Sequence, residues 1–283
     1  MKDLTASIVA YKNPANILAQ TIHSFLNSTS DSSLYIIDNS PTDQLKYLAY
    51  DPRITYIFNK KNVGFGAGHN ISLRQILDKS KYHLILNPDV YFEPDVLVKI
   101  HHYIERHPDI GLIMPKVLYP DGRLQHVCKL LPTPKTLIMR RFFAFLTTAL
   151  EKENSHYELH ASGYDKIMDV PFLSGCFMFV RTSSLKKVGL FDERFFLYTE
   201  DTDLSRRIHK HYRTVFYPET NIFHYHQRGS YKSPRLLWHN IKSAIKYFNK
   251  WGWAEDSDRE TFNTNTLKQI AALSSGGAFM KSP

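Results

Sequence analysis

Cysteine and long apolar runs are scarce in this chain. Two cysteines, Cys128 and Cys176, occur among 283 residues, in unrelated segments without metal-type spacing. A disulfide framework or a cysteine-based zinc site therefore has little support. No stretch of about 18 apolar residues is present, and no apolar leader precedes the strand-like run Ser7-Ile8-Val9-Ala10-Tyr11. We expect a globular protein of the reducing cytosol, neither secreted nor membrane-spanning.

The composition supports a real core and a basic surface. Apolar residues make up 43% of the chain and aromatic residues 13%, while the formal net charge is +9 and the pI about 9.3. Such a charge attracts polyanions. Because the basic residues are dispersed and no nucleic-acid module is recognisable, an anionic membrane surface or a phosphorylated substrate is a better candidate partner than nucleic acid.

Short β-rich runs alternate with helical patterns in the first half of the chain. We expect strands at 7–11, 34–38, 54–58 and 83–86, and helices at 16–27, 67–80 and 94–107. This alternation predicts a mostly parallel sheet covered by helices on both faces. In such sheets the ligand lies beyond the carboxyl ends of the strands.

Polar or glycine-rich segments follow each of these strands. They are Tyr11-Lys12-Asn13, Asp38-Asn39-Ser40, the stretch from Asn62 to Asn70, and Asn87-Pro88-Asp89. Each could be only a turn when taken singly. Together they predict a binding site on one rim of the sheet.

The glycine cluster faintly resembles a dinucleotide-binding fingerprint. Gly64 and Gly66 lie between a strand and a helix, but His69 stands where the third glycine would be, and the first strand is followed by a turn without glycine. An NAD-type oxidoreductase is thus the weaker alternative. The pattern favours glycines that let backbone amides approach a phosphate or base closely.

Three carboxylates lie together where a later helix is expected to begin. If Thr199 caps that helix, Glu200, Asp201 and Asp203 fall in its first turn, where the helix dipole favours negative charge. On its own this pattern could be the acidic start of an ordinary surface helix.

Two further helices combine apolar and basic residues. The segment 137–150 is apolar nearly all round, and 235–251 is amphipathic, basic and aromatic. Each suits either a buried position or a membrane interface. We expect one domain over 1–254, with a nucleotide-binding half (1–128) and an acceptor-binding, catalytic half (129–254), and a disordered tail over 255–283.

Five segments in fixed order resemble family 2 inverting glycosyltransferases, specifically the bacterial rhamnosyltransferase-like branch that builds surface polysaccharides. They are Asp38-Asn39-Ser40, Asn62 to Asn70, Leu86-Asn87-Pro88-Asp89-Val90, Phe172 to Arg181, and Gly189 to Arg206. The resemblance spans Thr5 to Trp251. It implies a GT-A type nucleotide-sugar-binding fold, with Mg²⁺ or Mn²⁺ bridging the diphosphate.

The resemblance also implies roles for individual residues. Asp89 would be the metal carboxylate, with Asn87 where the wider family carries a first aspartate, and His224 a metal ligand with His226 as its competitor. Asp201 would be the base that deprotonates the acceptor hydroxyl. The residues assigned to the nucleotide donor are Tyr11, Asn13, Asp38, Asn39, Gly66, Asn70 and Asn87. Those assigned to the acceptor or to positioning Asp201 are Glu200, Asp203, Arg206, Ser174 and Gly175, and the helical spacing pairs Arg206 with Asp203.

The expected function is therefore a metal-dependent inverting glycosyltransferase. It would move L-rhamnose from dTDP-L-rhamnose to a lipid-linked diphosphate saccharide in polysaccharide or cell-wall synthesis, acting peripherally at the inner face of the cell membrane. A non-catalytic nucleotide-sugar-binding scaffold of a polysaccharide assembly is the alternative.

Overall fold

The strands expected in the first half of the chain form one side of a nine-stranded sheet in a computed structural model. The structure describes residues 4–142, 147–225 and 233–275, with 140–142, 147–150 and 275 described by backbone only. The order is β3-β2-β1-β4-β10-β6-β11-β5, with β8 beside β11. The strand bounds are β1 Leu4–Ala10, β2 Ser32–Asp38, β3 Ile54–Phe58, β4 Tyr82–Leu86, β5 Val90–Tyr91, β6 Ile110–Leu118, β8 Met168–Asp169, β10 Phe177–Arg181 and β11 Arg213–His224.

Most of the sheet is parallel. β3, β2, β1 and β4 pair in parallel, and β6 pairs in parallel with β11. Because β10 is antiparallel to both β4 and β6, these two strands run the same way. The main strands therefore share one direction, and β5, β8 and β10 oppose it. The mostly parallel sheet predicted from the sequence is confirmed.

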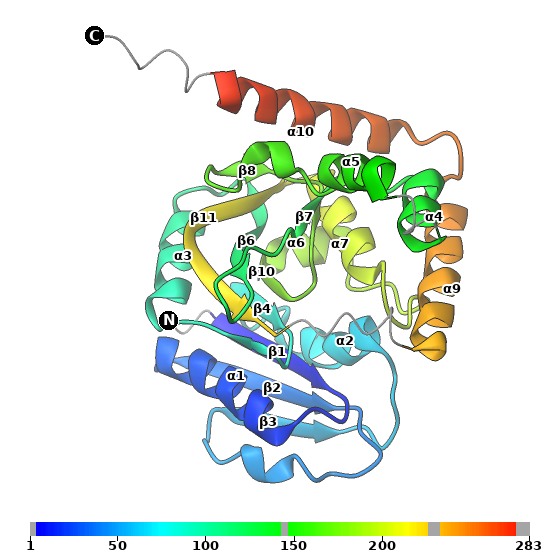
Figure 1. Cartoon of the computed structure of the whole chain (residues 1–283). Coiled ribbons are helices and arrows are strands. Elements are labelled where there is room, and N and C mark those ends of the chain that lie inside the picture. Colours follow the sequence, from blue (N-terminus) through cyan, green and yellow to red (C-terminus); the bar gives the residue numbers. More distant parts are fainter. Residues whose placement is uncertain (1–3, 143–146, 226–232, 276–283) are drawn as a thin grey trace.

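Helices cover both faces of this sheet (Figure 1). α1 (Ala15–Ser28) packs against α3 (Asp95–Glu105), and α7 (Glu200–His209) packs against α2 (Phe65–Ile76) and α6 (Thr182–Val188). Alternate residues of β1 point to opposite faces of the sheet. Ser7 and Val9 face α2, whereas Leu4, Ala6, Ile8 and Ala10 are buried in the main core. Short 3₁₀ helices η1 and η2 span Lys46–Leu48 and His160–Ser162.

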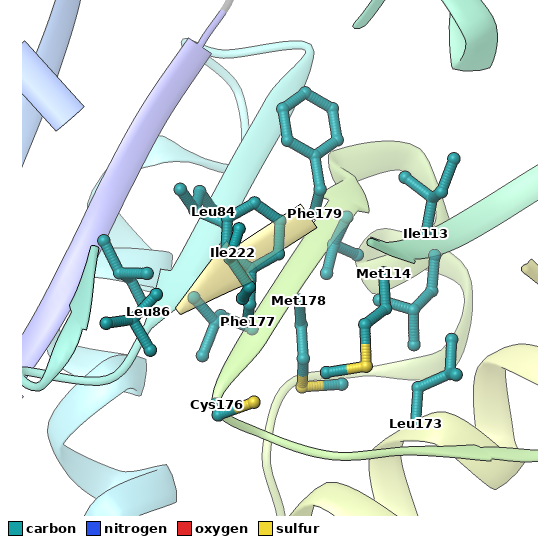
Figure 2. Close-up of a cluster of buried hydrophobic side chains, with 14 of the residues drawn as sticks. Leu84, Leu86, Ile113, Met114, Leu173, Cys176, Phe177, Met178, Phe179 and Ile222 are labelled. Atoms are coloured by element: carbon teal, nitrogen blue, oxygen red, sulfur yellow. The ribbon is translucent and has the colours of Figure 1, made fainter. Parts of the chain in front are cut away.

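Strand β10 joins the two parts of the sheet through an apolar run. Phe177, Met178 and Phe179 are fully buried between residues of β4 and β6, and Figure 2 shows them with Cys176 at the start of this strand. A two-stranded sheet of β7 (Cys128–Lys129) and β9 (Phe172–Leu173) lies before β10. This run therefore holds the turn before β10 against the carboxyl end of β4.

The carboxyl-terminal third differs from expectation in two ways. The described residues of the apolar segment 137–150 belong to two helices, α4 (Pro134–Phe142) and α5 (Thr147–Tyr157), while 143–146 lie outside the described residues. The expected helix near 235–251 is α9 (Pro234–Trp251). The expectation of a disordered tail was wrong for Ser257–Ser275, which forms α10 across the top of the view in Figure 1. Residues 276–283 of that expected tail lie outside the described residues.

Side-chain contacts explain the order of α10. Its Ile270 is 4% exposed and belongs to the main core, and its Thr266 hydroxyl donates to the carbonyl of Asp169 at 3.1 Å. Asn263 makes hydrogen bonds with both backbone groups of Leu131. The small and polar residues of this segment therefore bind particular partners. Among the described helices, none is both long and apolar enough to cross a membrane.

Candidate active site

The predicted rim exists at the carboxyl end of the parallel strands. The backbone N–H of Asn39 donates to the carbonyl of Ala10 at 2.8 Å, and that of Asn59 donates to the carbonyl of Asp38 at 2.9 Å. The ends of β1, β2 and β3 are thereby joined. β4 and β11 end on the same edge because they run parallel to these strands, and they deliver Asn87 and His224.

Asn87, Asp89 and His224 come together at this edge. The Nε2 atom of His224 lies 3.3 Å from a carboxylate oxygen of Asp89 and 3.4 Å from the side-chain nitrogen of Asn87. Strand pairing sets this contact, since His224 is in register with Val90 and the N–H of Tyr225 donates to the carbonyl of Asp89. The competing ligand candidate, His226, lies outside the described residues.

Gln125 orients His224, and the sequence contained no sign of this role. Its side-chain nitrogen donates to the carbonyl of His224 at 2.6 Å, and its side-chain oxygen lies 3.0 Å from Nδ1 of the ring. The ring therefore directs Nε2 towards Asp89. A histidine held through its other nitrogen is the usual arrangement of a metal ligand.

The charge of His224 fits a cation position. Burial of the ring lowers its pKa, but Cys176 and Asp89 more than offset this and raise the pKa to about 10. The carboxylate therefore faces a positive group in the protein alone. Once the ring has lost its Nε2 proton, the carboxylate oxygen and the imidazole nitrogen can share one divalent ion after small shifts.

Asp201 is held at the start of α7 by two backbone donors. The N–H of Gly175 donates to Oδ2 at 2.9 Å, and the N–H of Thr202 donates to Oδ1 at 2.8 Å. Burial nevertheless raises the pKa of Asp201. A carboxylate with a raised pKa is a stronger base.

Thr199 precedes α7 but does not cap it with its side chain. Its φ of 62° is left-handed, as is the 69° of Tyr198, and the Thr199 hydroxyl is buried without a partner among the described residues. Two consecutive left-handed residues that are not glycine indicate a constrained backbone. The expected cap was therefore wrong in mechanism, although the helix begins at Glu200 as predicted.

The turn from Ser174 to Cys176 links the two chemical groups. Its Cys176 carbonyl accepts the N–H of Asn87 at 2.9 Å, while its Gly175 N–H binds Asp201. A β-carbon on Gly175 would lie 3.1 Å from the β-carbon of Asp201. The turn therefore connects the candidate base Asp201 to Asn87, which lies beside Asp89 and His224.

Glu200 lies beside Asp201 and is buried. It is 4% exposed, and its Oε2 has no hydrogen-bond partner among the described residues. Burial raises its pKa well above the ordinary value, and the neighbouring Asp201 raises it further. The pair therefore resists carrying two negative charges.

The expected pairing of Asp203 with Arg206 was wrong. Asp203 is fully buried and binds Arg207 at 2.8 Å and the indole nitrogen of Trp251 at 2.8 Å. Arg206 instead binds Asp256. The i, i+4 spacing suits Asp203 and Arg207, and the chain beyond α9 supplies the partner for Arg206.

The predicted nucleoside-contact residues lie at the ends of β1 and β2. Asp38 accepts the N–H of Ser40 at 2.8 Å and the hydroxyl of Tyr56 at 2.6 Å, and Asn39 bonds to Asn59 and to the carbonyl of Gly64. Asn13 accepts the N–H of Tyr11 at 2.8 Å, and the Tyr11 ring is 41% exposed. Their contact with a nucleotide remains a prediction.

Gly66 and Asn70 contact protein at the start of α2. A β-carbon on Gly66 would lie 2.9 Å from the β-carbon of Phe191, and Asn70 bonds both backbone groups of Phe191 as well as the Glu193 carboxylate. These contacts give both residues a packing role. The glycine cluster therefore offers no support for the oxidoreductase alternative.

A cavity of about 610 Å³ lies away from these residues. It opens beside the beginning of β11 and beside α10, whereas His224 ends β11. No residue of the predicted site lines it. The lining includes Asp109, Asp169, His209, His211, Arg213 and Gln269.

Comparisons with known proteins identify the family of this chain. A family model described as "Glycosyltransferase like family 2" matches residues 2–243. The chain is 26% identical to the N-acetylglucosaminyl-diphospho-decaprenol L-rhamnosyltransferase of Mycobacterium tuberculosis, over 75% of this chain and 73% of that one. It is 28% identical to rhamnosyltransferase WbbL of Escherichia coli K12, over 65% and 69%.

A solved structure shows the same fold. The mannosyltransferase PcManGT from Pyrobaculum calidifontis, in complex with GDP-Man and Mn²⁺, matches with a TM-score of 0.58 and 15% identity over 99% of this chain and 76% of that one. The GT-A type fold expected from the sequence is confirmed. This chain belongs to the glycosyltransferase-like family 2 and is a glycosyltransferase.

Proposed function

We propose that this glycosyltransferase moves L-rhamnose from dTDP-L-rhamnose to a lipid-linked diphosphate saccharide, with inversion at the anomeric carbon. The named relatives support the sugar and the acceptor class, since one of them is an L-rhamnosyltransferase whose printed name includes diphospho-decaprenol. The observation that carries the chemistry is the Ser174 to Cys176 turn, which binds Asn87 and Asp201 at once.

In this proposal Asp201 is the general base. It accepts the proton of the acceptor hydroxyl as the oxygen attacks the anomeric carbon from the face opposite the diphosphate. The two backbone donors on Asp201 fix its direction, and burial raises its pKa. Glu200 lies next to it, where it helps to hold the acceptor or to position the base.

Asp89 and His224 would hold Mg²⁺ or Mn²⁺ against the donor diphosphate. The ion, when bound, neutralises the charge of the leaving diphosphate. The resident residues supply one carboxylate oxygen and one oriented imidazole, and the adjacent Asn87 is the third polar group at this edge. The ends of β1 and β2, with Asp38 and Tyr11, would receive the nucleoside.

The test is rhamnosyl transfer by Asp201→Asn. Loss of the base should lower kcat by about 10² to 10⁴-fold, while calorimetric binding of dTDP is unchanged. Asp121→Asn is the matched control, because Asp121 is an exposed carboxylate paired only locally with Arg123. Full transfer by Asp201→Asn would contradict the proposal and restore the scaffold alternative.

A further inference from the structure

A group of metal-ligating side chains lies outside the site described above. His126, Glu158 and His160 each offer one ligand atom, and these atoms all lie within 4.8 Å of one another. The two imidazole rings stack with centroids 3.7 Å apart, and Nε2 of His160 lies 3.4 Å from the Glu158 carboxylate. We call these three residues the histidine pair cluster.

The backbone on both sides of this cluster is fixed. The Tyr164 hydroxyl donates to the carbonyl of Glu158 at 2.7 Å and contacts both backbone groups of Cys128. The Tyr164 ring also meets His126 edge-on. Hydrogen bonds to one buried tyrosine therefore connect the segment that carries His126 with the turn that carries Glu158.

The turn itself is constrained in a way that brings its ligands together. Leu159, between Glu158 and His160, is left-handed with φ 54° and only 2% exposed. A left-handed residue reverses the chain locally, so neighbours on either side can face one direction. The buried Leu159 side chain anchors this conformation in the core.

We propose that the histidine pair cluster is a second metal site, which takes a borderline divalent transition ion such as Zn²⁺. Two imidazoles and one carboxylate are three of the four ligands of a tetrahedral zinc site, and solvent can supply the fourth because the side chains of His160 and Glu158 are 35% and 18% exposed. The rings are stacked with an interplanar angle of 23°, so one ring must turn about its side-chain torsions for both nitrogens to meet one ion in their ring planes.

Ligand chemistry separates this site from the donor site. The donor site expects Mg²⁺ or Mn²⁺ with diphosphate oxygens, whereas two nitrogen ligands favour zinc-like ions. The two sites are nevertheless linked, because His126 follows Gln125, whose side chain holds His224. An ion on His126 would therefore restrain the segment that orients His224.

The experiment uses full-length, untagged protein stripped with a chelator. Zn²⁺ binding is measured by calorimetry, and Co²⁺ serves as an absorption probe of four-coordinate geometry. Wild type should bind one Zn²⁺ tightly with a four-coordinate Co²⁺ spectrum. His126→Ala and His160→Ala should each weaken Zn²⁺ binding by more than about 10-fold, whereas Asp89→Ala should retain it.

A conservative variant guards against misfolding. Glu158→Gln keeps the backbone carbonyl that Tyr164 binds, and it should fold normally while losing the rise in thermal stability that Zn²⁺ gives wild type. The proposal is overturned if wild type binds Zn²⁺ no better than the two alanine variants. It is also overturned if Asp89→Ala abolishes the binding, because the ion would then belong to the donor site.

Discussion

At the residue scale, the two carboxylates that begin α7 are adjacent in sequence but differ in surroundings. Asp201 receives two backbone hydrogen bonds, whereas Oε2 of Glu200 has none among the described residues. Burial raises the pKa of both groups. Of these two carboxylates, Glu200 is therefore the one whose ionisation opposes folding more strongly.

The Glu200→Gln variant should show this in its pH dependence. A carboxyl whose folded pKa is raised stabilises the protein below its unfolded pKa of 4.5, and this contribution is lost as the pH rises through the folded pKa. The neutral glutamine of the variant does not ionise, so the variant does not lose stability in this way as the pH rises. Its free energy of unfolding relative to wild type, from urea denaturation, should increase between about pH 5 and pH 8. A difference that stays constant with pH would contradict this reading.

Single residues also show what the sequence could and could not predict. Residues after strand ends, such as Asp38 and Asp89, were expected at one rim because parallel strands end together, whereas Asp201 was assigned from the family resemblance. The sequence did not predict which side chains bind each other. Arg206 binds Asp256, fifty positions away, and Gln125 orients His224, ninety-nine positions away. Such pairs depend on tertiary packing, which no local pattern encodes.

At the scale of elements, the packing of α2 on β1 depends on a glycine. A β-carbon on Gly68 would lie 2.8 Å and 2.9 Å from the two methyl carbons of Val9. Gly68→Ala should therefore lower the free energy of unfolding by about 1 to 3 kcal/mol. Val9→Ala removes both methyl groups, so the double variant should be more stable than the two single changes predict. Strict additivity in chemical denaturation would contradict this contact.

Asp256, the residue just before α10, forms a buried ion pair with Arg206 of α7. The Arg206 and Asp256 side chains are 3% and 2% exposed, and one of their hydrogen bonds is 2.6 Å. Asp256→Ala would leave Arg206 buried and charged, which should cost about 3 to 5 kcal/mol. The control is Asp258→Ala, whose side chain is 30% exposed, pairs with Lys210 and lies no nearer than 4.0 Å to Arg206, and which should cost about 1 kcal/mol or less. Equal losses of thermal stability would contradict the assignment.

The sequence predicted β1 to β4, α1 to α3, α7 and α9, but it did not predict α10. Strong apolar periodicity marks the strands of the first half and α9, and these were confirmed. Residues 257–275 have weak helical amphipathicity, so their order comes from specific contacts such as Thr266 with Asp169. A helix stabilised by such long-range contacts leaves little signal in its own composition.

At the scale of the whole molecule, the positive charge and one outward stripe of α9 suit an anionic membrane. Trp238 and Ile245 are 55% and 44% exposed and lie among exposed Arg235, Lys242 and Lys246, with the Lys242 ammonium 4.9 Å from the Trp238 ring. Aromatic and basic residues on one helix face favour binding at a lipid interface. The equivalent surface of the segment 140–150 lies outside the described side chains.

This membrane proposal can be tested by vesicle sedimentation. Wild type should bind vesicles that contain anionic lipid and should release at high salt. Trp238→Ala with Lys242→Ala should weaken binding by about 10-fold or more, since each basic residue contributes about 1 kcal/mol. Tyr47→Ala, an exposed aromatic on η1, should leave binding unchanged. Equal binding by all three proteins would contradict the proposal.

The most direct test of the whole proposal is nucleotide binding at the edge formed by Asp89 and His224. Calorimetry would compare dTDP and UDP, with and without Mn²⁺, on wild type and Asp89→Ala. We predict that dTDP binds wild type only with Mn²⁺ and that Asp89→Ala loses this binding. The proposal would be contradicted if neither nucleotide binds wild type, or if Asp89→Ala binds dTDP as wild type does.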